Sequence, residues 1–155
     1  MIEIKSYLQT RDGRLVEIGA ASETLRDERY IDGALEMTVN GVRIIDVAMW
    51  DYIDQLWAYI CTMAADLQAT GEASTGFPDQ ALKLSFERQG RNRVLVTLTG
   101  TNVHRAASAA EDELVAALRE AGSAFFTELA RVLPHDGGSY AGALATLLGT
   151  SPPKT

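Results

Sequence analysis

The chain has 155 residues, of which 46% are hydrophobic and 23% are charged, and its formal net charge at pH 7 is −7. This length is enough for one domain with its own core, and the composition is that of an ordinary globular protein. Both properties argue against wholesale disorder and against an integral membrane protein. A single cysteine, Cys61, excludes an internal disulfide and a cysteine-rich zinc site.

The N-terminal residues 1–5 alternate apolar and charged side chains, without the basic stretch and apolar run of a signal peptide. No segment approaches the ~20 apolar residues that a membrane-spanning helix needs. We therefore expect no signal peptide, no membrane association and a cytoplasmic location.

Acidic residues are concentrated in the first half of the chain. Residues 1–80 contain 14 acidic and 6 basic residues, whereas residues 81–155 contain 7 and 8. An acidic surface repels nucleic acid and attracts a basic partner, although solubility alone would also explain such a charge. We expect no nucleic-acid partner and, as the candidate partner, a basic protein; the sequence does not predict an oligomeric state.

Two hairpins are predicted before the first helix. Apolar and polar residues alternate over residues 2–20, with a turn at Asp12-Gly13. The alternation resumes over residues 30–47 around Asn40-Gly41, the dipeptide that most strongly favours a tight hairpin turn. Gly33 interrupts the longer strand and is expected to mark a bulge.

Residues 49–69 predict an amphipathic helix that ends at Gly71. Its apolar side covers roughly half of the circumference, which is more than one sheet contact needs. We expect a second helix to cover the excess, although a partner protein or a ligand would also account for part of it. Tyr52 and Tyr59 lie at the edge of this side, and Asp51 and Asp54 lie on the opposite side.

Residues 70–80 are expected to form an irregular loop before a third hairpin, whose strands are residues 81–88 and 93–100. Four basic side chains occupy its turn and outward positions and form the only plausible anion-binding site in the sequence: Lys83, Arg88, Arg91 and Arg93. Residues 100–105 then read as a strand-to-helix connection. His104 in this connection either lines a cleft or is a solvated loop histidine.

The second helix is expected to begin with the capping-box pattern Ser108-Ala-Ala-Glu111 and to end before Pro134. Gly122 lies within its apolar stripe, where a glycine costs about 1 kcal/mol relative to alanine. We expect the close approach of a bulky group, a tryptophan of the first helix, to compensate for this cost.

Together these elements predict an α+β fold, in which an antiparallel sheet of about six strands, from three hairpins, carries two main helices on one face. Residues 1–135 form this single domain. Residues 136–155 are expected to form a short C-terminal helix or a flexible tail.

No catalytic motif is recognisable, because neither His104 nor His135 belongs to a triad order with a nucleophile. Cys61 is expected to be a packing residue. Asp51 and Asp54 share a helix face, and such pairs serve acid–base catalysis when burial separates their pKa values. An acidic first turn that complements the helix dipole is the simpler explanation. We predict no catalytic residue, no metal and no cofactor, although a hard-cation site among carboxylates is not excluded.

Three short motifs carry a resemblance to a known class of protein. They are Trp50-Asp-x-Ile-Asp-x-Leu-Trp57, Phe77-Pro-Asp-Gln80 and Phe125-Phe-x-Glu-Leu129. Over residues 30–133 the chain resembles small, uncharacterised actinobacterial proteins of the kind found as immunity partners of secreted toxins. The resemblance implies a single α+β domain that neutralises a toxin by binding it, with no catalytic residue.

We therefore expect a non-enzymatic interaction protein, of immunity type, that binds a basic toxin. Its candidate binding residues are Asp51, Tyr52, Asp54, Tyr59 and His104. The alternative is a small-molecule-binding protein or enzyme with an aromatic-lined cavity between sheet and helices. That cavity would be lined by Trp50, Trp57, Tyr59 and Phe125. A pocket of several hundred Å³ favours the alternative, whereas a filled core counts against it.

Overall fold

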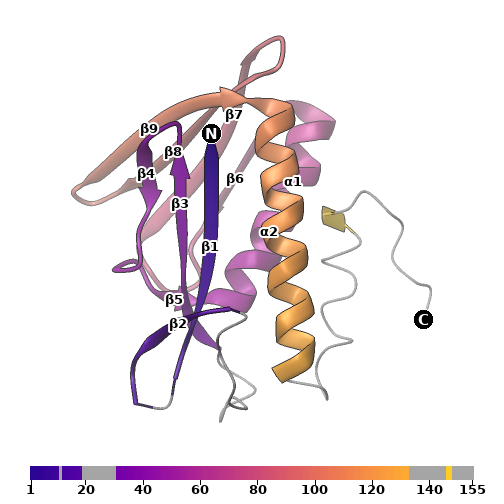
Figure 1. Ribbon diagram of the computed structural model, residues 1–155. Helices are drawn as coiled ribbons and strands as arrows, with labels where there is room; N and C mark the ends of the chain where they lie inside the picture. Colours follow the sequence, from indigo (N-terminus) through magenta and orange to yellow (C-terminus); the bar gives the residue numbers. More distant parts are fainter. Residues whose placement is uncertain (11, 19–30, 133–145, 148–155) are drawn as a thin grey trace.

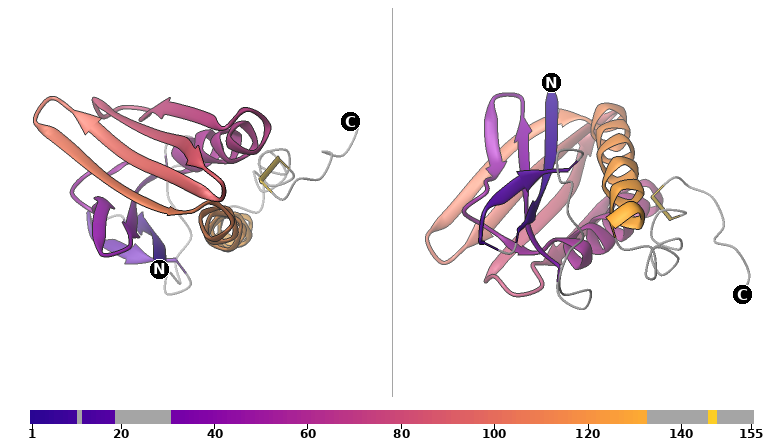
Figure 2. Two further views of the ribbon diagram at one scale, coloured as in Figure 1. Left: turned by 90° about the horizontal axis from the view of Figure 1, so that it is seen from above. Right: turned by 60° about the horizontal axis from the view of Figure 1, so that its bottom comes forward.

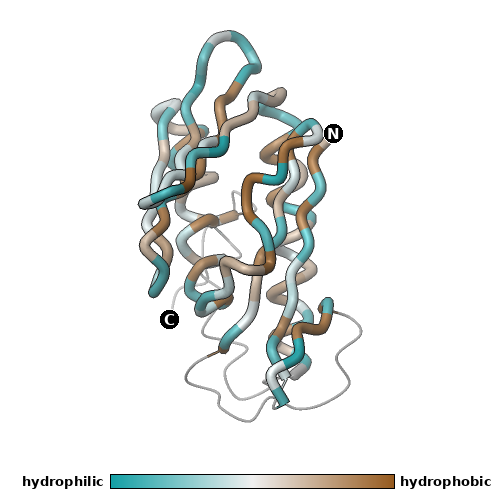
Figure 3. The backbone as a smooth tube through the Cα atoms, turned by 90° about the vertical axis from the view of Figure 1, so that its left-hand side faces the viewer, coloured by the Kyte–Doolittle hydropathy of each residue, from teal (hydrophilic) through white to brown (hydrophobic). Residues whose placement is uncertain are grey.

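The computed structural model describes residues 1–10, 12–18, 31–132 and 146–147, which form a five-stranded and a four-stranded antiparallel sheet and two long helices (Figure 1). The predicted α+β class and the packing of two helices against sheet are confirmed. All three expected hairpins are present. Hydrophobic and hydrophilic residues alternate along their strands, as the two-residue period of a strand requires (Figure 3).

The first sheet has the strand order β2-β1-β3-β4, and a short strand β5 also pairs with β3. Its strands are β1 (Ile2–Gln9), β2 (Leu15–Glu17), β3 (Asp32–Val39), β4 (Val42–Ile45) and β5 (Asp51–Tyr52). In the turn between β3 and β4, Asn40 has φ 47° and Gly41 has φ 85°. Both central positions of a type I′ turn need this left-handed backbone, which asparagine and glycine adopt more readily than other residues.

Gly33 does not mark a bulge. It pairs in regular register with Leu8 of β1, and the irregularity of β3 lies between Met37 and Thr38 instead. A Cβ atom at Gly33 would lie 2.2 Å from the carbonyl oxygen of Tyr7 and 2.7 Å from Cγ2 of Ile53. The glycine is therefore needed because β1 and the start of the first helix approach β3 too closely for a side chain.

The second sheet has the strand order β6-β7-β8-β9. Its strands are β6 (Glu72–Gly76), β7 (Leu82–Gly90), β8 (Arg93–Gly100) and β9 (Val103–Ala110). The expected irregular loop over residues 70–80 is thus partly wrong, because it contains β6. Gly71, at φ 84°, reverses the chain and places the following residues beside β7. These residues form a strand through pairing with β7 and not through an apolar pattern of their own.

The expected connection over residues 100–105 is also wrong, since the chain turns at Thr101 and Asn102 and returns as β9. β9 is rich in alanine, a weak strand former, and its pairing with β8 along its length overrides that preference. The capping box fails for the same reason. Ser108 lies within β9, where its hydroxyl accepts a hydrogen bond from Nη2 of Arg93 at 2.8 Å.

Helix α2 (Glu111–Val132) is capped from the turn between β7 and β8. The backbone N–H of Asp112 donates to Oδ1 of Asn92 at 3.0 Å, and that of Glu111 donates to the Asn92 carbonyl at 3.2 Å. Two of the N–H groups that a helix start leaves without an internal partner are satisfied in this way.

Helix α1 (Ile53–Thr70) begins four residues later than expected, because Asp51 and Tyr52 pair with β3. Trp50 therefore lies outside the helix and is 48% exposed. The helix ends at Gly71 as expected, where the glycine N–H donates to the carbonyl of Leu67 at 2.9 Å. Seen from above, the two helices lie beside each other, with the sheets to one side of them (Figure 2).

Aromatic residues fill the contact between the helices. The ring of Trp57 stacks on that of Phe125, with centroids 6.1 Å apart, and its Nε1 donates to the buried hydroxyl of Ser6 at 2.9 Å. A Cβ atom at Gly122 would lie 3.2 Å from Cζ3 of Trp57 and 2.4 Å from Cδ2 of Leu147. The expected approach of a tryptophan to Gly122 is confirmed.

The two sheets meet where β4 lies beside β9 (Figure 1). Nη1 of Arg105 donates to Oδ2 of Asp46 at 2.9 Å and to the carbonyl of Arg43 at 3.2 Å. Asn40 Nδ2 donates to the carbonyl of Ser108 at 2.7 Å. Polar side chains thus connect the two sheets across this junction.

Some expectations fall outside the residues that the structure describes. These are the end of the first hairpin at residues 19–20, Pro134, His135 and most of residues 136–155, of which Thr146 and Leu147 are described as helical. Neither helix in the described part of the chain is both long and apolar enough to cross a membrane.

Candidate interaction site

Asp51, one of the expected binding residues, lies in the interior with 1% of its surface exposed. Its carboxylate accepts the backbone N–H groups of Tyr52 at 2.6 Å, Asp79 at 3.0 Å and Gln80 at 2.8 Å. The side chain of Gln80 in turn donates to the carbonyl of Trp50 at 2.9 Å. Asp51 therefore holds the turn before β7 against β5.

The other expected binding residues do not gather at one place. Asp54, in the first turn of α1, is 5% exposed, and Tyr52 beside it is half-buried. Tyr59 is 41% exposed, farther along α1. His104 is exposed on β9 opposite Thr99, on the face away from the buried residues Val94, Val96 and Leu98. The described structure brings Asp51, Tyr52 and Asp54 together and leaves Tyr59 and His104 apart from them.

The aromatic residues of the alternative hypothesis do not line a common cavity. Trp57 and Phe125 are fully buried against each other, whereas Trp50 and Tyr59 are exposed. Cys61 is buried among the core residues, and burial raises the pKa of its thiol to about 12. The thiol therefore stays protonated at neutral pH and is not a nucleophile.

The basic patch expected on the third hairpin is divided by the structure. Arg88 forms a bidentate ion pair with Glu111, at 2.7 Å and 2.9 Å, and donates to the carbonyl of Leu67 at 3.0 Å. This pairing lowers the pKa of Glu111 and raises that of Arg88. Arg93 contacts Ser108, while Lys83 and Arg91 are exposed. Arg88 therefore joins the end of α1 to the start of α2 and is not directed at a solvent anion.

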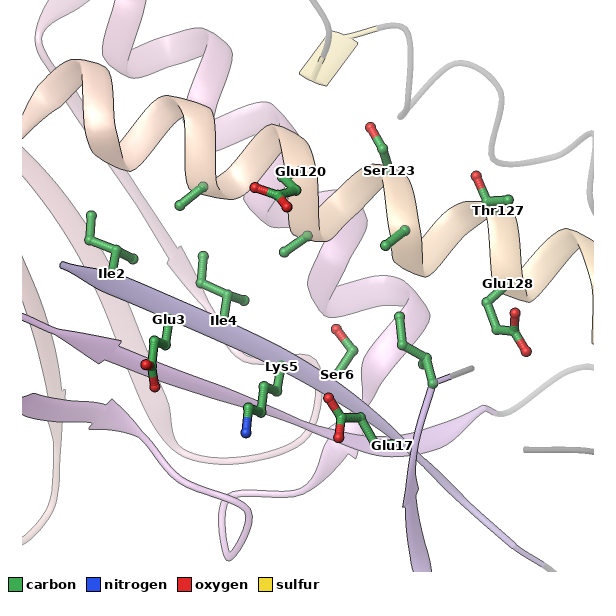
Figure 4. A pocket seen from close by; sticks show the side chains of 14 residues that line it. Ile2, Glu3, Ile4, Lys5, Ser6, Glu17, Glu120, Ser123, Thr127 and Glu128 are labelled. Carbon is green, nitrogen blue, oxygen red and sulfur yellow. The ribbon is translucent and has the colours of Figure 1, made fainter. Parts of the chain in front are cut away.

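A groove of about 850 Å³ runs between β1 and α2 (Figure 4). Ile2 and Ile4 of β1 point toward the helix, whereas Glu3 and Lys5 point to the other face of the strand. On the opposite side, α2 presents Ala117, Ala121 and Ala124. These residues recur at intervals of four and three and so share one face of the helix. Because their side chains end at Cβ, the helix does not fill the space above β1.

Carboxylates dominate the charged lining of this groove. Among the described residues, the acidic residues of the lining are Glu3, Glu17, Glu120 and Glu128, and the one basic residue is Lys5. Glu3, Lys5 and Glu17 lie on the face of the sheet turned away from α2, whereas Glu120 and Glu128 lie on the helix side. Glu128 forms an ion pair with Arg131. Glu17 and Glu120 are exposed, and neither has an ion-pair partner among the described residues. A cleft lined by charges of one sign concentrates the opposite charge, so the groove attracts cationic groups.

Sequence reasoning did not find this groove. The pattern of α2 is dominated by its large apolar residues, which pack into the core, and the neighbouring alanines with Glu120 and Glu128 beside them form a weaker pattern. That alanine face was the available signal, but the strand opposite to it is more than 110 residues away in the chain.

No group of three or more metal-binding side chains, whether His, Cys, Asp or Glu, occurs among the described residues. Compared with known proteins, the chain matches no family model, no curated protein and no solved structure. The chemistry of the described residues therefore supplies what can be inferred about function.

Proposed function

We propose that the protein is a non-enzymatic interaction module that binds a basic protein, and that neutralising a basic toxin, as an immunity protein does, is its role. The acidic groove between β1 and α2 is the observation that supports this proposal. It combines an apolar floor of isoleucine and alanine with carboxylates that have room for external partners.

The two parts of the lining would contribute differently to binding. Exposed ion pairs contribute only about 0.2–1 kcal/mol each, so the carboxylates mainly select basic partners and accelerate their association. Burial of apolar surface yields about 25 cal/mol per Å², so the floor formed by Ile2, Ile4 and the alanines supplies more of the affinity. A partner should therefore offer basic side chains next to small or medium apolar ones.

The test is affinity purification from the native host at low salt, with the wild-type protein and with a Glu17→Lys/Glu120→Lys double variant. A matched control, Glu72→Lys/Glu87→Lys, changes the net charge equally on two exposed, paired residues of the other sheet. We expect a basic protein to bind the wild type and the control, to be lost from the groove variant, and to dissociate as salt rises.

The captured protein must then be identified and the complex reconstituted from purified components. Rescue of growth when both proteins are co-expressed would support the toxin-neutralising role. Recovery of no basic protein at low salt would overturn the proposal, as would equal binding to the groove variant.

A second candidate function is binding of a cationic small molecule, which the volume of the groove favours. Thermal unfolding with and without spermidine tests it. A rise in Tm for the wild type that is absent from Glu17→Gln/Glu120→Gln would support this function. No rise in Tm for the wild type would eliminate it.

A further inference from the structure

Among the described residues, the first half of β1 has no strand partner on the side away from β3. On the side away from β3, the described partner strand β2 pairs only with residues 7–9 of β1, and Ile18 adds one hydrogen bond to the carbonyl of Ser6 at 3.0 Å. On this side, no described strand pairs with residues 2–5. The groove runs along the same residues, because residues 2–6 of β1 form part of its lining.

Alternate residues of β1 direct their backbone N–H and C=O groups to opposite sides of the strand, which identifies the groups that face this edge. The carbonyl of Met1 accepts the N–H of Asn40 at 2.8 Å, toward the end of β3. In an antiparallel pair, alternate residues bond to the same neighbour, so Glu3 and Lys5 bond to β3. Ile2 and Ile4 therefore direct their N–H and C=O groups to the other side, as Ser6 directs its carbonyl to Ile18.

An edge of this kind binds an extended chain more readily than a helix. A helix satisfies its own backbone groups internally and would leave those of Ile2 and Ile4 without protein partners. An added strand satisfies them, and peptide recognition by strand addition works in this way. β1 carries no proline, and its pairing with β3 is regular along residues 2–8, so of the devices that commonly protect an edge strand only charged side chains, Glu3 and Lys5, are present here.

Building on the proposed function, we propose that the basic partner binds by adding an extended segment to β1 beside residues 2–5, in line with β2. Side chains of a strand alternate between its two faces. One set would contact Ile2, Ile4 and the alanine face of α2, and the other would lie on the face of Glu3, Lys5 and Glu17, where the two carboxylates outnumber the lysine. The segment is therefore one that alternates apolar and basic residues.

The probe is an acetylated, amidated eight-residue peptide of alternating lysine and valine, measured by isothermal titration calorimetry at low salt. Two further versions carry backbone N-methyl groups on all valines or on all lysines. Only one of these sets of N–H groups can face β1 in an added strand. We expect one version to bind at least about tenfold more weakly than the unmodified peptide and the other to stay within about twofold.

Variants of Ile4 test the same edge from the side of the protein. Ile4→Pro removes an N–H that faces the groove and leaves the bonds between β1 and β3 in place, which is where a strand tolerates proline. Ile4→Ala is the matched control, since it removes the side chain and keeps the N–H. We expect Ile4→Pro to bind the peptide at least about threefold more weakly than Ile4→Ala. Circular dichroism tests whether both variants fold. If Ile4→Pro does not fold, the N-methylated peptides measured on the wild type decide whether the segment binds by strand addition.

Equal binding of the two N-methylated peptides would overturn strand addition. So would absence of binding of the unmodified peptide to the wild type. Neither result touches the proposed function, provided that the partner identified by affinity purification still requires Glu17 and Glu120. Conversely, if the groove carboxylates do not matter for any basic partner, the proposed function itself fails.

Discussion

The basic hairpin and the acidic groove are both charged, but they differ in where their partners lie. On β7, Arg88 is held by Glu111 and by the carbonyl of Leu67, so its charge is used within the fold. At the groove, Glu17 and Glu120 are exposed and have no ion-pair partner among the described residues. A charged patch in a sequence becomes a candidate site only where the fold leaves the charges without internal partners. Substitutions in the two regions should accordingly affect different properties.

The largest loss of stability is expected for Asp51→Asn, which tests a buried charge that is used within the fold. The amide has one oxygen in place of two and brings donors that face backbone N–H groups, so we expect the free energy of unfolding to fall by about 2–3 kcal/mol. Urea unfolding measures this change. The control Asp79→Asn alters an exposed carboxylate in the same turn and should change stability by less than about 0.5 kcal/mol. Equal stability of the two variants would contradict the role given to Asp51.

Arg88→Ala should have the next largest effect. It removes the pair with Glu111 and the hydrogen bond to Leu67, and we expect a fall in the urea midpoint that is smaller than for Asp51→Asn, because solvent screens an ion pair whose arginine side chain is 38% exposed. Lys83→Ala, at an exposed position of the same strand, should change the urea midpoint little. A similar effect of both substitutions would mean that Arg88 is no more engaged in the fold than a surface lysine.

The pH dependence of stability should show whether Glu111 is the partner through which Arg88 stabilises the fold. Arg88 lowers the pKa of Glu111 in the folded state, so this pair stabilises the protein fully above the pKa of about 4.3 that an unfolded glutamate has. The contribution is lost as the pH falls through the lower pKa of the folded protein. The difference in urea midpoint between wild type and Arg88→Ala should therefore stay constant from about pH 7 to about pH 5 and shrink as the pH falls below about 4. A constant difference would show that Glu111 is not the relevant partner.

The smallest effect on stability is expected in the groove. Glu17→Gln/Glu120→Gln should change the free energy of unfolding by less than about 0.5 kcal/mol, because both carboxylates are exposed and neither has an ion-pair partner among the described residues. The same variant should bind the lysine–valine peptide about threefold to tenfold more weakly. Glu72→Gln/Glu87→Gln serves as control in both measurements. If this variant bound the peptide as well as the wild type but was less stable, the groove carboxylates would support the fold and would not be a binding site.

Several elements were predictable because their signals are local. The turn at Asn40 and Gly41, the end of α1 at Gly71 and the three hairpins depend on backbone preferences and on alternation within short segments. The contact between Gly122 and Trp57 was also predictable, since an unfavourable glycine within an apolar stripe needs a spatial reason.

Other elements had no local signal. β6 and β9 are polar or rich in alanine and become strands because β7 and β8 offer them hydrogen-bonding partners. The cap of α2 comes from Asn92, 20 residues before Asp112, so no capping motif at the helix start could reveal it.

For the candidate site, the sequence by itself determined its ingredients: the excess of acidic residues, the alternation of β1 and the alanines of α2. Only the tertiary structure decided that Ile2, Ile4 and the alanine face lie opposite each other and that Arg88 pairs within the fold. It also decided that Glu17 and Glu120 have no ion-pair partner in the part of the chain that the structure describes. The physical reason is that a groove and an open strand edge are relations between segments far apart in the chain. Hydropathy and turn preferences determine the secondary structure of each segment. The packing of the core determines which segments lie side by side.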